Sequence, residues 1–259
     1  MKTCCCTIAC KSGEWTAEQA IDLAARLGFD AVELWGGFLE KADADRLTQI
    51  RAACDQAGLA VPLISPYMGF FDLGKSNYQD MVEQCARFIE VARVMRVRQL
   101  RSFAGFVCEI SSATCDDANW GYVINGFLEY AAMAEQGDVD ILIETHKESL
   151  VDSVQGIEKL LRAVPSRRMR LNLQLDDMVA LSNMEPEAIW QRLKDRVAHF
   201  HYRWWADPVK NEQTKRWLAC MKRDGWDGFA SIEYVDGEET ADRIAGVGLD
   251  RLREDWASV

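Results

Sequence analysis

Short apolar runs alternate with longer amphipathic runs about eight times along this 259-residue chain, and this alternation constrains the fold more than any other feature. The short runs have the length and composition of β-strands, and the longer runs carry apolar residues at helical spacing. Regular alternation of strands and helices predicts a parallel sheet.

We expect strands at 4–10, 30–34, 59–64, 97–102, 139–144, 169–175, 197–202 and 229–234. We expect helices at 16–27, 43–57, 77–95, 117–135, 151–164, 211–223 and 238–256, with a short one opened by Pro186. Thr16 and Gln19 form a capping box, and Gly28 follows the end of that helix. Eight units of each kind predict an α/β fold, a single-domain (β/α)8 TIM barrel over residues 1–259. An open doubly wound sheet is disfavoured, because residues 11–15 carry no glycine fingerprint after the first strand.

The charge balance restricts the kinds of partner. The chain has 41 acidic and 30 basic side chains, a net charge of −11. This disfavours nucleic-acid binding, which depends on Lys and Arg at phosphates, and also binding to anionic membranes. No segment has the length of a signal sequence or a membrane span, so we expect a cytoplasmic protein with a small-molecule substrate.

The nine cysteines include no CxxC pair. We therefore expect neither a zinc ribbon nor a redox motif, but small buried side chains in a reducing compartment.

Four consecutive predicted strands end in potential metal ligands. In a TIM barrel the active site lies at the carboxyl ends of the strands. Strands five to eight end, in order, at Glu144, Asp176, His201 and Glu233. Three carboxylates and one imidazole at one rim predict a divalent ion, and suit Mn²⁺ or Mg²⁺ better than a structural zinc.

This order of residues resembles the sugar phosphate isomerase/epimerase superfamily of xylose-isomerase-like TIM barrels. The segment 28–34 (GFDAVEL) is similar to the family's second strand, and the four ligands match in order over nearly the whole chain. The resemblance implies one bound divalent metal ion, often Mn²⁺, with Mg²⁺, Co²⁺ or Zn²⁺ as alternatives. It also implies that Glu144 and Glu233 double as acid and base beside the substrate.

The chain departs from that family at three positions. Val179 replaces a histidine, Trp204 replaces an aspartate, and Arg203 replaces a common lysine. These changes leave fewer of the polar side chains that recognise a free sugar. The endonuclease branch of the superfamily is excluded, because it needs more histidines than the three present.

His146 offers a second candidate base. It lies two residues after Glu144, so we expect both on the same side of the strand, and an imidazole suits proton abstraction at neutral pH. A Glu-x-His strand end also resembles the family's dehydratases and carbon-glycoside-cleaving lyases. The alternative is that His146 only hydrogen-bonds its neighbours.

Other side chains at strand ends are candidates for substrate binding. Arg101 and Arg203, and less so Lys147, suit a phosphate or carboxylate. Trp35, Tyr67 and Trp204 could line a sugar or aromatic pocket, or equally bury a contact between copies in a homo-oligomer.

Three hypotheses about function follow. The first, which the sequence favours slightly, is an isomerase or epimerase of a keto-sugar or related polyol. It would act by proton abstraction next to a metal-bound carbonyl, through an enediolate. The second is a metal-dependent lyase of the same fold with His146 as base. The third, a non-catalytic binding protein or partner subunit, is disfavoured because all four ligands are present.

Overall fold

The computed structural model describes all residues except 12, 14, 71–77, 106–109 and 176. Eight parallel strands close into a barrel, because β3 pairs with both β2 and β5. In order they are β1 (Lys2–Cys6), β2 (Ala31–Trp35), β3 (Ile64–Ser65), β5 (Gln99–Ala104), β6 (Asp140–Glu144), β7 (Met169–Leu173), β8 (Val197–Trp204) and β9 (Phe229–Val235). A short extra strand, β4 (Gly69–Phe70), adds to the edge of β5.

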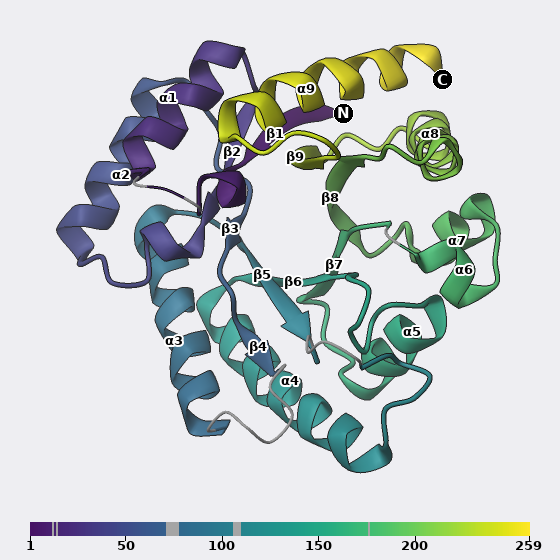
Figure 1. The fold of residues 1–259 in the computed structure, drawn as a ribbon. Helices are drawn as coiled ribbons and strands as arrows, with labels where there is room; N and C mark the ends of the chain where they lie inside the picture. Colours follow the sequence, from purple (N-terminus) through teal and green to yellow (C-terminus); the bar gives the residue numbers. More distant parts are fainter. Residues whose placement is uncertain (12, 14, 71–77, 106–109, 176) are drawn as a thin grey trace.

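The helices surround the barrel as an outer layer (Figure 1). They are α1 (Ala17–Leu27), α2 (Ala44–Gln56), α3 (Tyr78–Met95), α4 (Asp117–Gly137), α5 (Val154–Ala163), α6 (Met178–Ser182), α7 (Pro186–Leu193), α8 (Pro208–Arg223) and α9 (Ala241–Ser258). Short 3₁₀ helices follow β1 at Thr7–Lys11 and β2 at Gly36–Phe38. The predicted (β/α)8 barrel is confirmed. None of the described helices has the length and apolar character needed to cross a membrane.

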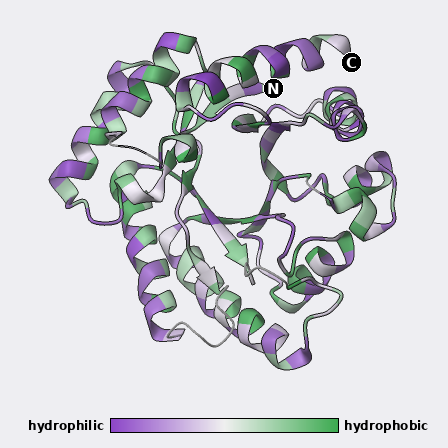
Figure 2. Ribbon diagram, viewed as in Figure 1, coloured by the Kyte–Doolittle hydropathy of each residue, from purple (hydrophilic) through white to green (hydrophobic). Residues whose placement is uncertain are grey.

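Side-chain alternation along the strands divides the molecule into an apolar shell and a polar centre. On β8, Phe200 and Tyr202 belong to the core side, whereas His199 and His201 take part in a buried polar network. Figure 2 shows the apolar residues of the helices concentrated on the faces toward the barrel. Since successive strand residues point to opposite faces, the intervening residues are free to carry chemistry inside the barrel.

The first, third and sixth predicted strands are shorter than expected, and the sixth ends at Leu173 instead of 175. The first ends at Cys6, because the Thr7 hydroxyl donates to the Glu33 carbonyl and accepts from the Trp35 amide, so a side chain replaces the backbone pairing. The third reduces to one bridge at Ala60 and the two residues of β3. Pro62 lies between them, and proline has no amide hydrogen for a sheet.

Several helix ends follow the sequence closely. The capping box of Thr16 and Gln19 is present, and Gly28 closes α1 with a positive φ of 76°. Helix α8 begins earlier than predicted, at Pro208, because Asp207 caps it and proline suits a first helical position. The eight described cysteines are all free thiols, seven of them buried, and the ninth, Cys108, lies outside the described residues.

Candidate metal and substrate site inside the barrel

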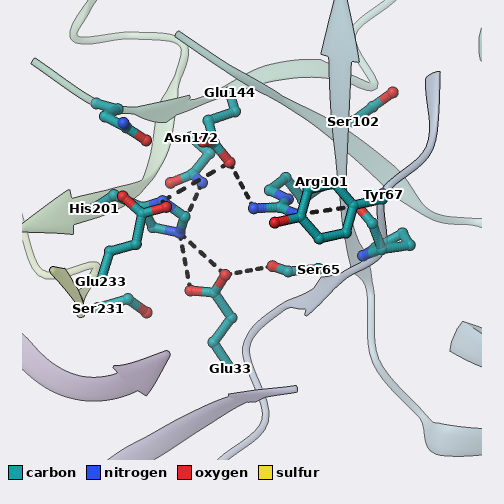
Figure 3. Close-up of polar contacts among 12 residues, drawn as sticks. Glu33, Ser65, Tyr67, Arg101, Ser102, Glu144, Asn172, His201, Ser231 and Glu233 are labelled. Atoms are coloured by element: carbon teal, nitrogen blue, oxygen red, sulfur yellow. Dashed lines mark hydrogen bonds and ion pairs between the residues drawn. The ribbon is translucent and has the colours of Figure 1, made fainter. Parts of the chain in front are cut away.

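Three of the four predicted ligands meet inside the barrel. Glu144 of β6, His201 of β8 and Glu233 of β9 each place a ligand atom within 4.8 Å of the others, and all three are buried. His201 Nδ1 lies 3.8 Å from Glu144 Oε2 and 3.7 Å from Glu233 Oε1. Figure 3 shows the carboxylates converging on this ring. The fourth predicted ligand, Asp176, lies outside the described residues.

The opposite side of the His201 ring faces Glu33 of β2. Nε2 lies 3.0 and 3.1 Å from the two carboxylate oxygens of Glu33. His199 Nε2 approaches the same carboxylate at 3.1 Å, and the Ser65 hydroxyl also donates to it. Glu33, His199 and His201 are each at most 1% exposed, so this network lies deep in the barrel.

This arrangement shifts the acid–base behaviour of the buried groups. Burial alone lowers the pKa of His201, but the Glu33 and Glu233 carboxylates outweigh it and raise that pKa to about 9. Burial raises the pKa of Glu33, yet His201 and His199 hold it well below its ordinary value. The pKa of His199 is lowered by burial, which Glu33 only partly offsets.

Arg101 of β5 adds a permanent cation beside the three-ligand cluster. Its Nη1 donates to Glu144 Oε2 at 2.9 Å and its Nη2 to the Pro66 carbonyl at 3.1 Å. The guanidinium also lies over the rings of Tyr67 and Phe103, at 5.3 and 4.6 Å from their centroids. Burial opposes the charge, but Glu144 raises the pKa of Arg101 above its ordinary value.

His146 and Tyr67 lie near Arg101 around Phe103. Strand β6 ends at Glu144, and the His146 amide turns back to the Glu144 carbonyl, so the expected same-side placement on a continuing strand does not arise. The half-buried His146 ring instead packs edge-on against Phe103, with centroids 6.4 Å apart. Tyr67 stacks on the same ring, and its hydroxyl accepts from Lys11 at 3.2 Å.

The other predicted substrate-binding residues are dispersed. The Trp35 ring packs edge-on against Phe38, and its buried Nε1 has no hydrogen-bond partner within the described part of the chain. Arg203 lies over the rings of Trp205 and Tyr234, at 4.3 and 5.0 Å. Trp204 packs against the core, with the Arg251 guanidinium of α9 5.0 Å from its ring.

Sequence reasoning gave no role to several residues of the network. These are Glu33, Ser65, Asn172, His199 and Ser231. A signal was available for Glu33, because it stands between Val32 and Leu34 in an otherwise apolar strand and therefore points to the other face. Lys147 is exposed after β6.

Comparisons with known proteins agree with this architecture. The family model for xylose isomerase-like TIM barrels matches residues 21–255. A 3-dehydroshikimate dehydratase from Bacillus anthracis is 23% identical over 207 residues, which cover 78% of this chain and 71% of that protein.

Solved structures show the same fold. The probable 3-DHS dehydratase involved in petrobactin synthesis in Bacillus anthracis has a TM-score of 0.80 at 20% identity, covering 98% of this chain and 99% of its own. The D-allulose 3-epimerase from Methylomonas sp. has a TM-score of 0.75 at 15% identity, covering 98% of this chain and 98% of its own. The 3-keto-D-glucoside 4-epimerase from E. coli has a TM-score of 0.78 at 12% identity, covering 98% of this chain and 99% of its own. These relatives are enzymes of two kinds, dehydratases and epimerases. The family match over most of the chain shows that this protein belongs to the xylose isomerase-like TIM barrels.

Proposed function

We propose that this protein is a divalent-metal-dependent lyase of the dehydratase type, acting on a small polyhydroxylated ketone that carries a carboxylate. One observation carries the proposal: the buried Arg101 guanidinium beside the three-ligand cluster. Its Nη1 and Nη2 bind Glu144 and the Pro66 carbonyl, but its buried Nε has no hydrogen-bond partner among the described residues, which leaves a charged donor for an anionic substrate group. A neutral ketose offers it no such partner.

The residues present suit a divalent ion. His201 Nδ1 is buried, aims between two carboxylates and has no hydrogen-bond partner among the residues described. Glu144, His201 and Glu233 would hold the ion, with Asp176 as the proposed fourth ligand. A bound Mn²⁺ or Mg²⁺ would act as a Lewis acid toward a substrate carbonyl. Mn²⁺ as the preferred ion and a cytoplasmic location remain predictions.

The chain's own residues divide the remaining work. Arg101 would hold the substrate carboxylate, and Tyr67 and Phe103 would flank it as apolar walls. His146, at the rim beside Phe103, would accept the proton from the carbon next to the carbonyl. The electron pair of the broken C–H bond forms a carbon–carbon double bond, and the leaving hydroxyl takes the proton back from His146 and departs as water, which restores the neutral imidazole. Glu144 is already engaged by Arg101, which favours His146 as the base.

The second candidate is an epimerase of a keto-sugar, which the sequence favoured slightly. The observation in its favour is that Glu144 and Glu233 both lie within 4 Å of His201 Nδ1, so that two carboxylates would adjoin a substrate held at the proposed metal. In that case one glutamate removes the proton and the other returns it to the opposite face.

The two candidates differ in the product formed in deuterium oxide. The Mn²⁺-loaded protein is incubated with 3-dehydroshikimate, and separately with D-allulose and D-fructose. The lyase proposal expects loss of one water from the keto acid, seen as a new ultraviolet absorbance and a mass change, and no reaction of the ketoses. Deuterium incorporation into a ketose without loss of water would overturn the lyase in favour of the epimerase.

A further inference from the structure

We propose that Glu33 is a positioning residue for the metal ligand His201: it keeps the imidazole hydrogen on Nε2, so that the bare Nδ1 faces Glu144 and Glu233. The inference rests on the metal site proposed above. It concerns a residue that reaches neither substrate nor metal, because Glu33 lies on the far side of the His201 ring (Figure 3).

Hydrogen-bond chemistry fixes the direction of the contact. An ionised carboxylate accepts hydrogen bonds and cannot donate them. Both oxygens of Glu33 lie 3.0–3.1 Å from His201 Nε2, so Nε2 must be the protonated nitrogen. In a neutral imidazole the other nitrogen then carries a lone pair, which is the state a metal ligand requires.

Asn172 of β7 agrees with the same tautomer once its amide is turned. Its Nδ2 lies 3.0 Å from His201 Nε2, so two hydrogen-bond donors would face each other if Nε2 carries the hydrogen. Its Oδ1 is buried and has no hydrogen-bond partner in the described part of the chain. The two ends of an amide are assigned from the hydrogen-bond network and can be exchanged. Turning the Asn172 amide brings Oδ1 to the Nε2 hydrogen and removes the conflict.

The surroundings hold Glu33 in place for this task. Ser65 of β3 donates to its carboxylate and His199 Nε2 of β8 lies 3.1 Å from it, so Glu33 contacts two other strands. Glu33 is 0% exposed, and its carboxylate oxygens already contact Ser65, His199 and His201. A buried carboxylate that binds the remote nitrogen of a metal-ligating histidine orients the ring, and its loss typically lowers metal affinity about 10- to 100-fold.

The test measures Mn²⁺ binding by calorimetry on the full-length protein. Glu33→Gln keeps the size but offers fewer acceptors, and Glu33→Met offers none. We expect about 10-fold weaker binding for Glu33→Gln and about 100-fold for Glu33→Met. The matched control, Glu90→Gln, makes the same change at an exposed glutamate of α3 that pairs with Arg93, and should bind Mn²⁺ like the wild type.

A second readout needs no metal. In ¹⁵N-histidine-labelled protein, at a pH where the imidazole is neutral, the His201 signals should show hydrogen on Nε2 in the wild type. In Glu33→Gln, which preserves the fold best, hydrogen should appear partly on Nδ1. An unchanged tautomer in both variants, or unchanged Mn²⁺ affinity, would overturn the positioning role.

Two further outcomes separate this inference from the proposed function. A wild-type protein that binds no Mn²⁺ would refute the metal site, while the tautomer would still report on Glu33. The Cys6 thiol lies within 4.8 Å of ligand atoms of both Glu33 and His201. If Cys6→Ser weakened Mn²⁺ binding as much as Glu33→Gln, Glu33 would be a ligand of an ion bound there and not a positioning residue.

Discussion

Arg101 of β5 and Glu144 of β6 form an ion pair 2.9 Å long whose side chains are only 2% and 1% exposed. It lies beside two further buried carboxylates, Glu33 and Glu233. Arg101 and a protonated His201 together balance only two of the three negative charges. The barrel centre therefore attracts a further cation, which is an electrostatic reason for a metal site independent of any resemblance.

Breaking this pair from the cationic side should strongly destabilise the metal-free protein. Arg101→Met leaves Glu144 buried and uncompensated, which typically costs about 3–5 kcal/mol in the free energy of unfolding. Urea denaturation followed by circular dichroism measures it. The double variant Arg101→Met/Glu144→Gln should recover most of the loss, since it removes both charges.

The control is an ion pair on the surface. Arg98 pairs with Asp138, but these side chains are 73% and 55% exposed. Arg98→Met should change the unfolding free energy little, because water screens an exposed pair. A loss as large as that of Arg101→Met would show that the effect comes from the arginine stem and not from burial of the charge.

The barrel could be predicted from the sequence because the residues that indicate each strand or helix lie within a short segment of the chain. The apolar stripe and the caps of α1 lie within a few residues of one another. The network around Glu33 could not, because Glu33 and His201 are 168 positions apart and their contact depends on barrel closure. The end of β1 could not be predicted either, because it depends on hydrogen bonds between the Thr7 side chain and the backbone of β2.

Glu233→Gln should abolish turnover while leaving the fold intact. The side chain ends the last barrel strand beside His201, so the change removes a ligand or a proton carrier without opening a cavity. We expect at least a 100-fold loss of kcat, the lower range for an acid–base group. Product formation and a circular dichroism spectrum check both parts. Retained activity would make this glutamate merely structural.

Asp176 can be tested by comparison with its neighbour. As a ligand, Asp176→Asn should weaken Mn²⁺ binding at least about 10-fold. Asp177→Asn should leave it unchanged, because Asp177 pairs with Lys210 at 2.8 Å. Calorimetry measures both. Unchanged Mn²⁺ binding by Asp176→Asn would contradict its role as the fourth ligand. Gln174, a residue 1% exposed just after β7, would then be the next candidate.

The stability of the metal-free protein should fall as pH rises above 6.5. The pKa of His201 is raised to about 9 in the fold, against about 6.5 in an unfolded chain. A raised pKa stabilises the fold fully below pH 6.5, and this contribution is lost as pH approaches 9.

The useful window for that measurement is pH 6.5–8. Below this window the lowered pKa of His199 makes the unfolding free energy depend on pH. Above about pH 8.5 the buried thiols do so, because cysteine ionises there in the unfolded chain. His201→Gln removes the titrating group, so its unfolding free energy should vary less with pH across the window. Equal slopes for variant and wild type would contradict the raised pKa.

His146 separates the two enzymatic candidates. If it is the base of the lyase, His146→Ala should lower kcat at least about 100-fold, since general bases typically contribute 100- to 10,000-fold. Mn²⁺ content should stay at one ion per chain, because His146 lies at the rim beside Phe103 and not among the three clustered ligands. Under the epimerase candidate, with Glu144 and Glu233 exchanging the proton, the same change should raise KM more than it lowers kcat. The matched control is Lys147→Ala, the exposed neighbour, which should leave both constants near the wild-type values. Unchanged kinetics in His146→Ala would remove the residue from both mechanisms and leave the glutamates as the proton carriers.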